Sequence, residues 1–261
     1  MTSVLDDAAR CVMDVLRGER SARPTPDTSA AARLRGTLEG SLAQRLGDQA
    51  REEPITVSAS SLRHGAAPKP GASAHASLRG ILLNQALRLL CAGAPIDDVY
   101  RDALYAWRAE GKESYLRGYV DQLGGDDAAR LRADVEAHWV TLKRSLGSLS
   151  SWWLPRTSLR AYQRLAQGNV ILRDLVDLMV GTTSSDLASV VILDVTTSPL
   201  DDGAERVLRY HALVQTLRTG VVPLRSSMFC TATGELRSAD VDVELLSRSV
   251  DDVLSVIDRL A

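Results

Sequence analysis

Apolar and polar residues follow different patterns in the two halves of the chain. From residue 148 onward, apolar residues alternate with polar ones or run continuously over short segments, which is typical of β-strands. The run VVILDV at 190–195 is continuous, as in a strand buried on both faces of a sheet. Strand-like patterns occupy 159–165, 170–180, 190–195 and 224–232, and helix-like spacing occupies 202–219 and 243–260. The back half is therefore predicted to be an α/β unit.

Helix-like spacing dominates the front half of the chain. Stretches rich in proline and small polar residues interrupt it at 18–29 and 63–73. The predicted helices are 5–17, 30–50, 77–91, 96–117 and 126–146, with a brief strand within 54–62.

These patterns predict how the chain is divided into domains. N-terminal helices are expected in 1–53, with a linker near 18–29. A single domain is expected in 54–261, with a helical insertion at 77–147 and a core at 153–261. Within the domain, a helical part thus precedes the predicted sheet.

Composition narrows the classes of partner and compartment. A net charge of −2 over 261 residues provides no overall basic field for nucleic acid, although Arg156, Arg160, Arg164 and Arg173 leave a local groove open. No apolar run approaches the ~20 residues that cross a bilayer, and the first residues lack the pattern of a signal peptide. We therefore expect a cytoplasmic protein without a membrane partner, and the excess of arginine over lysine suggests a bacterial source.

Two aspartates in neighbouring predicted strands are the strongest chemical signal. Asp177 lies within 170–180 and Asp194 within 190–195, so both carboxylates can meet at one end of the sheet. Mg²⁺ prefers such oxygen ligands, commonly one or two carboxylates with water and phosphate. The alternative is that both acids cap nearby backbone amides. Asp194 interrupts an apolar run, however, where an uncompensated carboxylate would be costly to bury.

The segments that carry these acids resemble a known family. WLPRTSLRAYQRLAQGNVILRDLVDLMVG, VVILDVTTS, RVLRYHALVQTLRTGVVP and SMFCTATGE together resemble the PD-(D/E)XK nuclease superfamily in its RecB-type branch. The resemblance implies an α/β fold with a central mixed sheet flanked by helices and a helical N-terminal half. It implies that Asp177 and Asp194 are metal ligands for Mg²⁺ or Mn²⁺. Tyr210 and Gln215 match residues of the following helix that face the site.

Two positions depart from the family pattern. RGILLNQAL resembles the branch's Gly-x-x-x-His helix, with Gly80 in place and Asn84 at the third metal position, where the family has histidine. Thr196 stands where the family has lysine, two residues after Asp194 and on the same strand face. Losing one preorganised donor typically costs ~10²–10³ in rate at comparable sites. A relocated cation could replace the lysine, and the candidates are Arg173, Arg206, Arg209 and Lys143.

Three functions compete on this basis. The departures favour a pseudonuclease that binds DNA or serves as a subunit of a DNA-processing or defence complex, beside a helicase or an active nuclease subunit. The alternative enzyme is a metal-dependent DNase that hydrolyses phosphodiesters with a relocated cation. A purely structural assembly subunit is the third, and a large exposed apolar patch would favour it.

Other residues have plainer interpretations. Tyr210 is more typical of a half-buried helix position, and Gln215 of a solvated one. His211 is expected at the surface or at an interface. Trp152 and Trp153 could stack on bases, but packing at a hinge between the helical block and the sheet is the favoured role.

Overall fold

The computed structural model describes residues 12–18, 24–25, 27–47, 51–64, 73–111, 115–184 and 186–261. The first part of the helix predicted at 5–17 and half of the predicted linker at 18–29 lie outside these residues. Ten α-helices and strands that frame the site are α4 (Ala74–Cys91), α7 (Gly125–Leu146), β1 (Ile55–Ser58), β2 (Arg156–Leu165), β3 (Val170–Val180), β4 (Val191–Thr196), α8 (Gly203–Thr219), β5 (Arg225–Cys230), β6 (Leu236–Asp240) and α9 (Val243–Leu260). The other described helices are α1 (Val12–Arg17), α2 (Ala30–Leu46), α3 (Ala59–His64), α5 (Val99–Ala109) and α6 (Tyr115–Asp121), with short 3₁₀ turns at Ser151–Trp153 and Ala166–Gly168.

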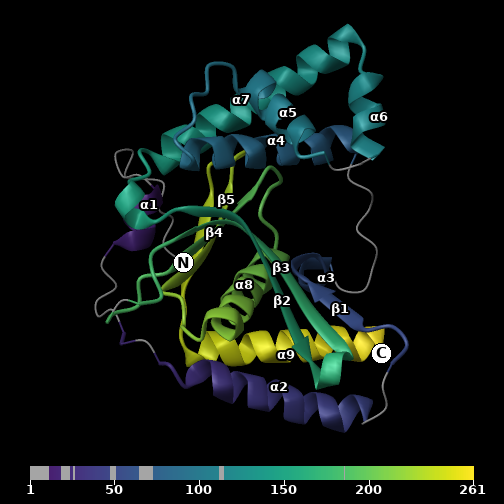
Figure 1. Ribbon diagram of the computed structural model, residues 1–261, viewed down its shortest axis with the longest axis vertical. Helices are drawn as coiled ribbons and strands as arrows, with labels where there is room; N and C mark the ends of the chain where they lie inside the picture. Colours follow the sequence, from purple (N-terminus) through teal and green to yellow (C-terminus); the bar gives the residue numbers. More distant parts are fainter. Residues whose placement is uncertain are drawn as a thin grey trace.

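A six-stranded mixed sheet forms the centre of the molecule (Figure 1). β2 runs antiparallel to β3 along nearly its whole length, β4 is antiparallel to β3, and β5 is parallel to β4. β6 closes one edge, antiparallel to β5. The predicted α/β fold with a mixed sheet flanked by helices is therefore confirmed.

β3 divides one of its edges between two partner strands. β2 occupies one edge along the ladder from Val170 to Met179, so β1 and β4 must share the other edge. β1 pairs with Val170–Arg173, and β4 pairs only with Leu178–Val180. Residues 174–177 therefore lie in a fork where β1 has ended and β4 has not yet paired. Both acids of this stretch, Asp174 and Asp177, are buried.

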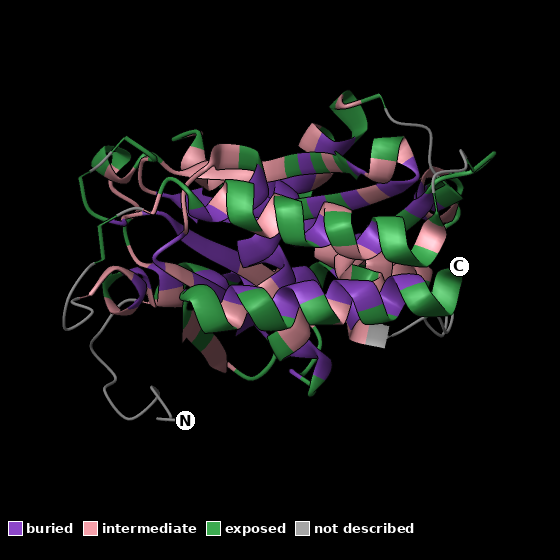
Figure 2. Cartoon of the chain, turned by 90° about the horizontal axis from the view of Figure 1, so that it is seen from below, coloured by how far each residue is buried: buried purple, intermediate pink, exposed green. Residues whose placement is uncertain are grey.

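Helices cover the sheet from two sides. α2, α8 and α9 share a core with β1 and with the first half of β3, whereas α1 and α4–α7 share a core with the second half of β3, β4 and β5. In Figure 1 the block α4–α7 lies above the sheet, and α2 and α9 lie below it. Figure 2, seen from below, shows the outer sides of these helices exposed and their inner sides buried. The N-terminal helices are thus packed onto the cores of the later residues.

Several element boundaries differ from the sequence-based prediction. The helix expected at 96–117 is two helices, α5 and α6, because Gly111 adopts a left-handed φ of 69° that a helix interior does not accommodate. The predicted strand within 54–62 ends at Ser58, whose hydroxyl accepts a hydrogen bond from Ser61 N at 3.3 Å and starts α3. β6 was not predicted, since its polar sequence LRSAD lacks the pattern of a buried strand.

Within the described residues, no helix is both long enough and apolar enough to cross a bilayer.

We expect Tyr210→Phe to lower the free energy of unfolding by about 1–2 kcal/mol. The buried Tyr210 hydroxyl lies 2.8 Å from the carbonyl oxygen of Val57 and 2.9 Å from that of Arg173, so it ties α8 to β1 and β3. Urea unfolding would measure the loss. The matched control is Tyr162→Phe, because Tyr162 is exposed on β2 and its variant should stay within about 0.5 kcal/mol of the wild type. Equal stability of both variants would contradict a structural role for the Tyr210 hydroxyl.

Candidate functional site

The two predicted acids meet at the fork in the sheet. Asp177 is buried on β3, and its Oδ2 accepts a hydrogen bond of 2.8 Å from the backbone N–H of Val195, the residue after Asp194. The Asp194 carboxyl group and the side chain of Asn84 on α4 both lie close enough to Asp177 to influence its pKa. The structure therefore brings together all three positions that the family resemblance assigns to the metal.

A buried histidine bridges two acids at this fork. His211 on α8 places its Nδ1 2.7 Å from Oδ1 of Asp174, and its Nε2 3.7 Å from Oδ2 of Asp194. Its side chain is 1% exposed, so the prediction of a surface or interface position is wrong. The error arises because α8 is buried on almost all sides and carries no polar stripe that marks a solvent face.

Gln215 completes the support of this histidine. It lies four residues after His211, and positions four apart on a helix share a face. Its Nε2 donates to Oδ2 of Asp174 at 3.2 Å, while its Oε1 accepts from Nε of Arg218 at 2.8 Å. Gln215 is buried and not solvated. It belongs to the cluster but contacts Asp174, an acid that sequence reasoning missed; the polar pair at 211 and 215 in an apolar helix was the available signal.

Thr196 and Tyr210 do not face the acid pair in the way the resemblance implies. The Thr196 hydroxyl accepts a hydrogen bond of 3.1 Å from Ser198 N, which shapes the turn after β4. The Tyr210 hydroxyl contacts the backbone carbonyls of β1 and β3. Both residues stabilise the surroundings of the fork, and neither contacts Asp177 or Asp194 through a hydrogen bond.

The relocated cations considered from the sequence are engaged or directed elsewhere. Arg206 donates to the carbonyls of Leu62 and Arg63 at the end of α3, and Arg209 pairs with Asp252 of α9 at 2.8 Å. Arg173 and Lys143 are exposed. Within the described part of the chain, the cationic group closest to the acids by hydrogen-bonding geometry is the imidazole of His211.

The charges of the cluster are strongly coupled. Burial, followed by the charge of Asp194, raises the pKa of Asp177 well above its usual value. Burial would also raise the pKa of Asp194, but the nearby His211 and its positive charge outweigh burial and lower that pKa. Burial would lower the pKa of His211, yet Asp174 and then Asp194 raise it well above its usual value. These shifts favour the protonated form of Asp177, the ionised form of Asp194 and the charged form of His211.

The donor set fits a bound Mg²⁺ poorly. Asp177, Asp194 and Asn84 offer oxygen atoms, the ligand type that Mg²⁺ prefers. However, Oδ2 of Asp177 is already bonded to the N–H of Val195, and Asp194 is already neutralised by His211. Among the residues that the structure describes, no group of three or more His, Cys, Asp or Glu side chains is arranged to hold a metal ion. Within the described residues, His211 is the side chain placed to supply positive charge to this cluster.

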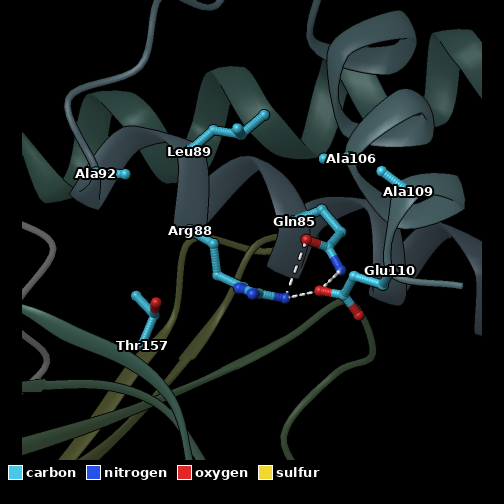
Figure 3. Close-up of a pocket in the computed structure, with 8 residues that line it drawn as sticks. All are labelled: Gln85, Arg88, Leu89, Ala92, Ala106, Ala109, Glu110 and Thr157. Atoms are coloured by element: carbon cyan, nitrogen blue, oxygen red, sulfur yellow. Dashed lines mark hydrogen bonds and ion pairs between the residues drawn. The ribbon is translucent and has the colours of Figure 1, made fainter. Parts of the chain in front are cut away.

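A separate cavity lies between α4, α5 and β2 (Figure 3). It measures about 500 Å³ and is lined mainly by small or apolar residues of the two helices and by Thr157. Its one cation, Arg88, contacts the carboxylate of Glu110, to which Gln85 also donates at 2.9 Å. Because the charge in this cavity is neutralised internally, it offers no site for an anion.

Trp152 and Trp153 lie in different environments. Trp153 packs against the core of the helical block, and the guanidinium of Arg17 stacks 4.3 Å from the centre of its ring. This contact agrees with the predicted hinge role. Trp152 is 91% exposed, so the hinge interpretation is wrong for this residue.

We expect the free energy of unfolding to fall as the pH rises above about 6.5, where an unfolded histidine loses its proton. His211 keeps its proton in the folded chain, so the stability it contributes is present at lower pH and is lost toward its raised pKa. Asp177 acts in the same direction, because its raised pKa favours the protonated form on folding. The lowered pKa of Asp194 affects only more acidic solutions.

Urea unfolding between pH 6 and pH 9 would measure this slope in the wild type and in two variants. His211→Gln cannot carry the charge, so its slope should be shallower even if the variant is less stable overall. Asp177→Asn resembles the protonated acid and should gain stability relative to the wild type as the pH rises. A slope that both variants leave unchanged would contradict this charge assignment.

Comparison with known proteins adds little to this geometry. No family model and no curated protein matches the chain. Among solved structures, the chain is similar to one described as "Crystal structure of SSO0001", at 9% identity and a TM-score of 0.34 over 86% of this chain and 85% of that chain. A likeness of this size carries no argument about fold or function.

Proposed function

We propose that this chain is a nuclease-like protein of the PD-(D/E)XK superfamily, RecB-type branch, that binds DNA without cutting it. It would work in a DNA-processing or defence complex, beside a protein partner such as a helicase or an active nuclease subunit. The proposal is supported by the order of elements around the fork and by the meeting of Asn84, Asp177 and Asp194 there.

One observation carries the loss of cleavage. The imidazole of His211 lies between Asp174 and Asp194, at 2.7 Å and 3.7 Å, and so stands beside one of the two acids that the family resemblance assigns to the metal. A metal ion works at such a site by activating water and by stabilising the charge on the scissile phosphate. A buried histidine that is hydrogen bonded to Asp174 and faces Asp194 offers no open coordination position for either task.

The position of the missing lysine supports the same conclusion. Thr196 is held in a turn by Ser198 and has no charge to stabilise an oxyanion. Arg206 and Arg209 are committed to α3 and to Asp252, so neither replaces the lysine. The scaffold thus keeps the acids of a nuclease site and satisfies them with groups of the protein.

An active DNase is the second candidate, because one group that can carry a positive charge does reach Asp194. His211 on α8 would then be the relocated cation, 3.7 Å from Asp194. That enzyme would require Asp177 to lose its proton and Asp194 to exchange its contact with His211. The absence of cleavage is supported by the hydrogen bond from Val195 N–H to Asp177 and by the position of His211 beside Asp194.

We expect the wild type to show no metal-dependent cleavage of single- or double-stranded DNA above that of Asp194→Ala. The assay would use Mg²⁺ and Mn²⁺ separately, with circular dichroism to establish that both proteins are folded. The Thr196→Lys variant alone should remain inactive, because His211 would still lie beside the Asp194 carboxylate. Cleavage by the wild type that Asp194→Ala abolishes would overturn the proposal in favour of the DNase.

Metal binding should agree with the cleavage assay. A ligand that binds only the folded state raises the free energy of unfolding by RT ln(1 + [L]/Kd). We expect Mn²⁺ to raise the unfolding temperature of the wild type no more than that of Asp194→Ala, measured by differential scanning fluorimetry. A stabilisation that disappears in Asp194→Ala would identify a working metal site.

A further inference from the structure

The outer side of the β2–β3 hairpin carries a basic strip with an exposed aromatic residue. Arg160, Tyr162 and Arg164 alternate along β2 and therefore share one face, and Arg173 lies directly opposite Tyr162 on β3. We call these four residues the arginine–tyrosine strip. All four are exposed, with Tyr162 at 55%.

The strip is an uncompensated cluster of positive charge. Elsewhere in the described chain, many arginines form ion pairs, as Arg209 does with Asp252. Within the described residues, Arg160, Arg164 and Arg173 have no such ion pair. The neighbours of the strip on β3 are Ile171 and Leu175, opposite Arg164 and Arg160, so no acid lies between the strip residues. Asp177, the next residue on this face of β3, is buried.

The sheet holds the strip in a fixed arrangement. β2 and β3 pair through nine residue pairs, from Arg156 with Met179 to Leu165 with Val170. Ala161 and Leu165, which alternate with the strip residues, are buried in the core beneath. Arg35 of α2 further fixes β2 by donating to Oε1 of Gln163 at 2.6 Å. A ligand would therefore meet charges that are already in position.

Protection of an edge strand explains only part of this surface. β2 is an edge strand, and charged residues on such strands prevent pairing with other chains. That role accounts for the arginines. It does not account for Tyr162, nor for Leu175, which is 45% exposed in the same patch. An aromatic ring between guanidinium groups is the arrangement that accepts a base between two phosphates.

We propose that the arginine–tyrosine strip binds single-stranded DNA. The guanidinium groups would contact backbone phosphates through charge-assisted hydrogen bonds, and the ring of Tyr162 would stack on an unpaired base. Residues two apart on a strand are separated by about 6.8 Å, so the charges of Arg160 and Arg164 flank the ring at short range. A duplex keeps its bases stacked internally and would engage only the arginines. This inference rests on the proposed DNA-binding function and names its substrate.

Fluorescence anisotropy with a labelled oligo-dT and a matched duplex, without divalent metal, tests the strip. Tyr162→Ala should weaken binding of the single strand by about fivefold to a hundredfold, as loss of one base–aromatic stack typically does. Tyr162→Phe should keep affinity close to that of the wild type, because phenylalanine retains the ring. The matched control is Tyr105→Ala, since Tyr105 is 77% exposed on α5, outside the strip.

The arginines are tested by salt dependence. Arg160→Gln combined with Arg164→Gln should weaken binding and flatten the plot of log affinity against log salt, because each phosphate contact contributes about 0.7 to the slope for a single strand. Arg248→Gln removes a charge from α9, where Arg248 contacts Glu244, and should leave the slope unchanged.

The outcomes distinguish binding at the arginine–tyrosine strip from DNA binding by the chain in general. Binding of the single strand by the wild type that Tyr162→Ala and the double arginine variant leave intact would overturn the strip and leave DNA binding standing. A preference for the duplex would overturn the assignment to single strands. Failure of the wild type to bind either DNA would overturn both the strip and the DNA-binding function, whereas the cleavage assay concerns only the acids at the fork.

Discussion

The divided edge of β3 is the constraint on which the rest of the structure depends. β1 ends at the level of Arg173 and β4 begins to pair at Leu178, so the strand between them has no neighbour on that side. Acidic side chains occupy this interval, and a buried carboxylate is costly unless hydrogen bonds and opposite charge compensate it. Helix α8 therefore places His211 and Gln215 against Asp174, and the Tyr210 hydroxyl against the carbonyl of Val57. The backbone N–H of Val195 donates to Asp177.

The charges of the buried acids are compensated by groups of the protein itself. In a metal-dependent site the positive charge arrives with a cofactor and leaves coordination positions for water and substrate. Here an imidazolium supplies the charge, bonded to Asp174 on one side and facing Asp194 on the other. Breaking such a buried arrangement by removing one partner leaves an uncompensated charge. The same contacts that stabilise the fold thus oppose the chemistry that the acids could otherwise support.

The sheet also separates two kinds of surface. Its fork is covered by α8 on one side and approached by Asn84 of α4, so that region is enclosed by the two helical layers. The outer side of the β2–β3 hairpin is exposed, and its three guanidinium groups beside Tyr162 form no ion pair with any residue that the structure describes. The proposed binding surface and the acids at the fork therefore do not share residues.

The sequence by itself determined most of the elements, because periodicity records which face of a helix or strand is buried. It also predicted that Asp177, Asp194 and Asn84 meet, since two neighbouring strands and the residue types of a family pattern carry them. It could not determine the partner of these acids. His211 stands in a helix that is buried on almost all sides, so its sequence pattern shows no site-facing side. Asp174 lies three residues from Asp177, and only the fork explains why both are inside. Tertiary structure decided which group neutralises the acids, because that choice depends on the position of α8 across the gap and not on the local pattern of either segment.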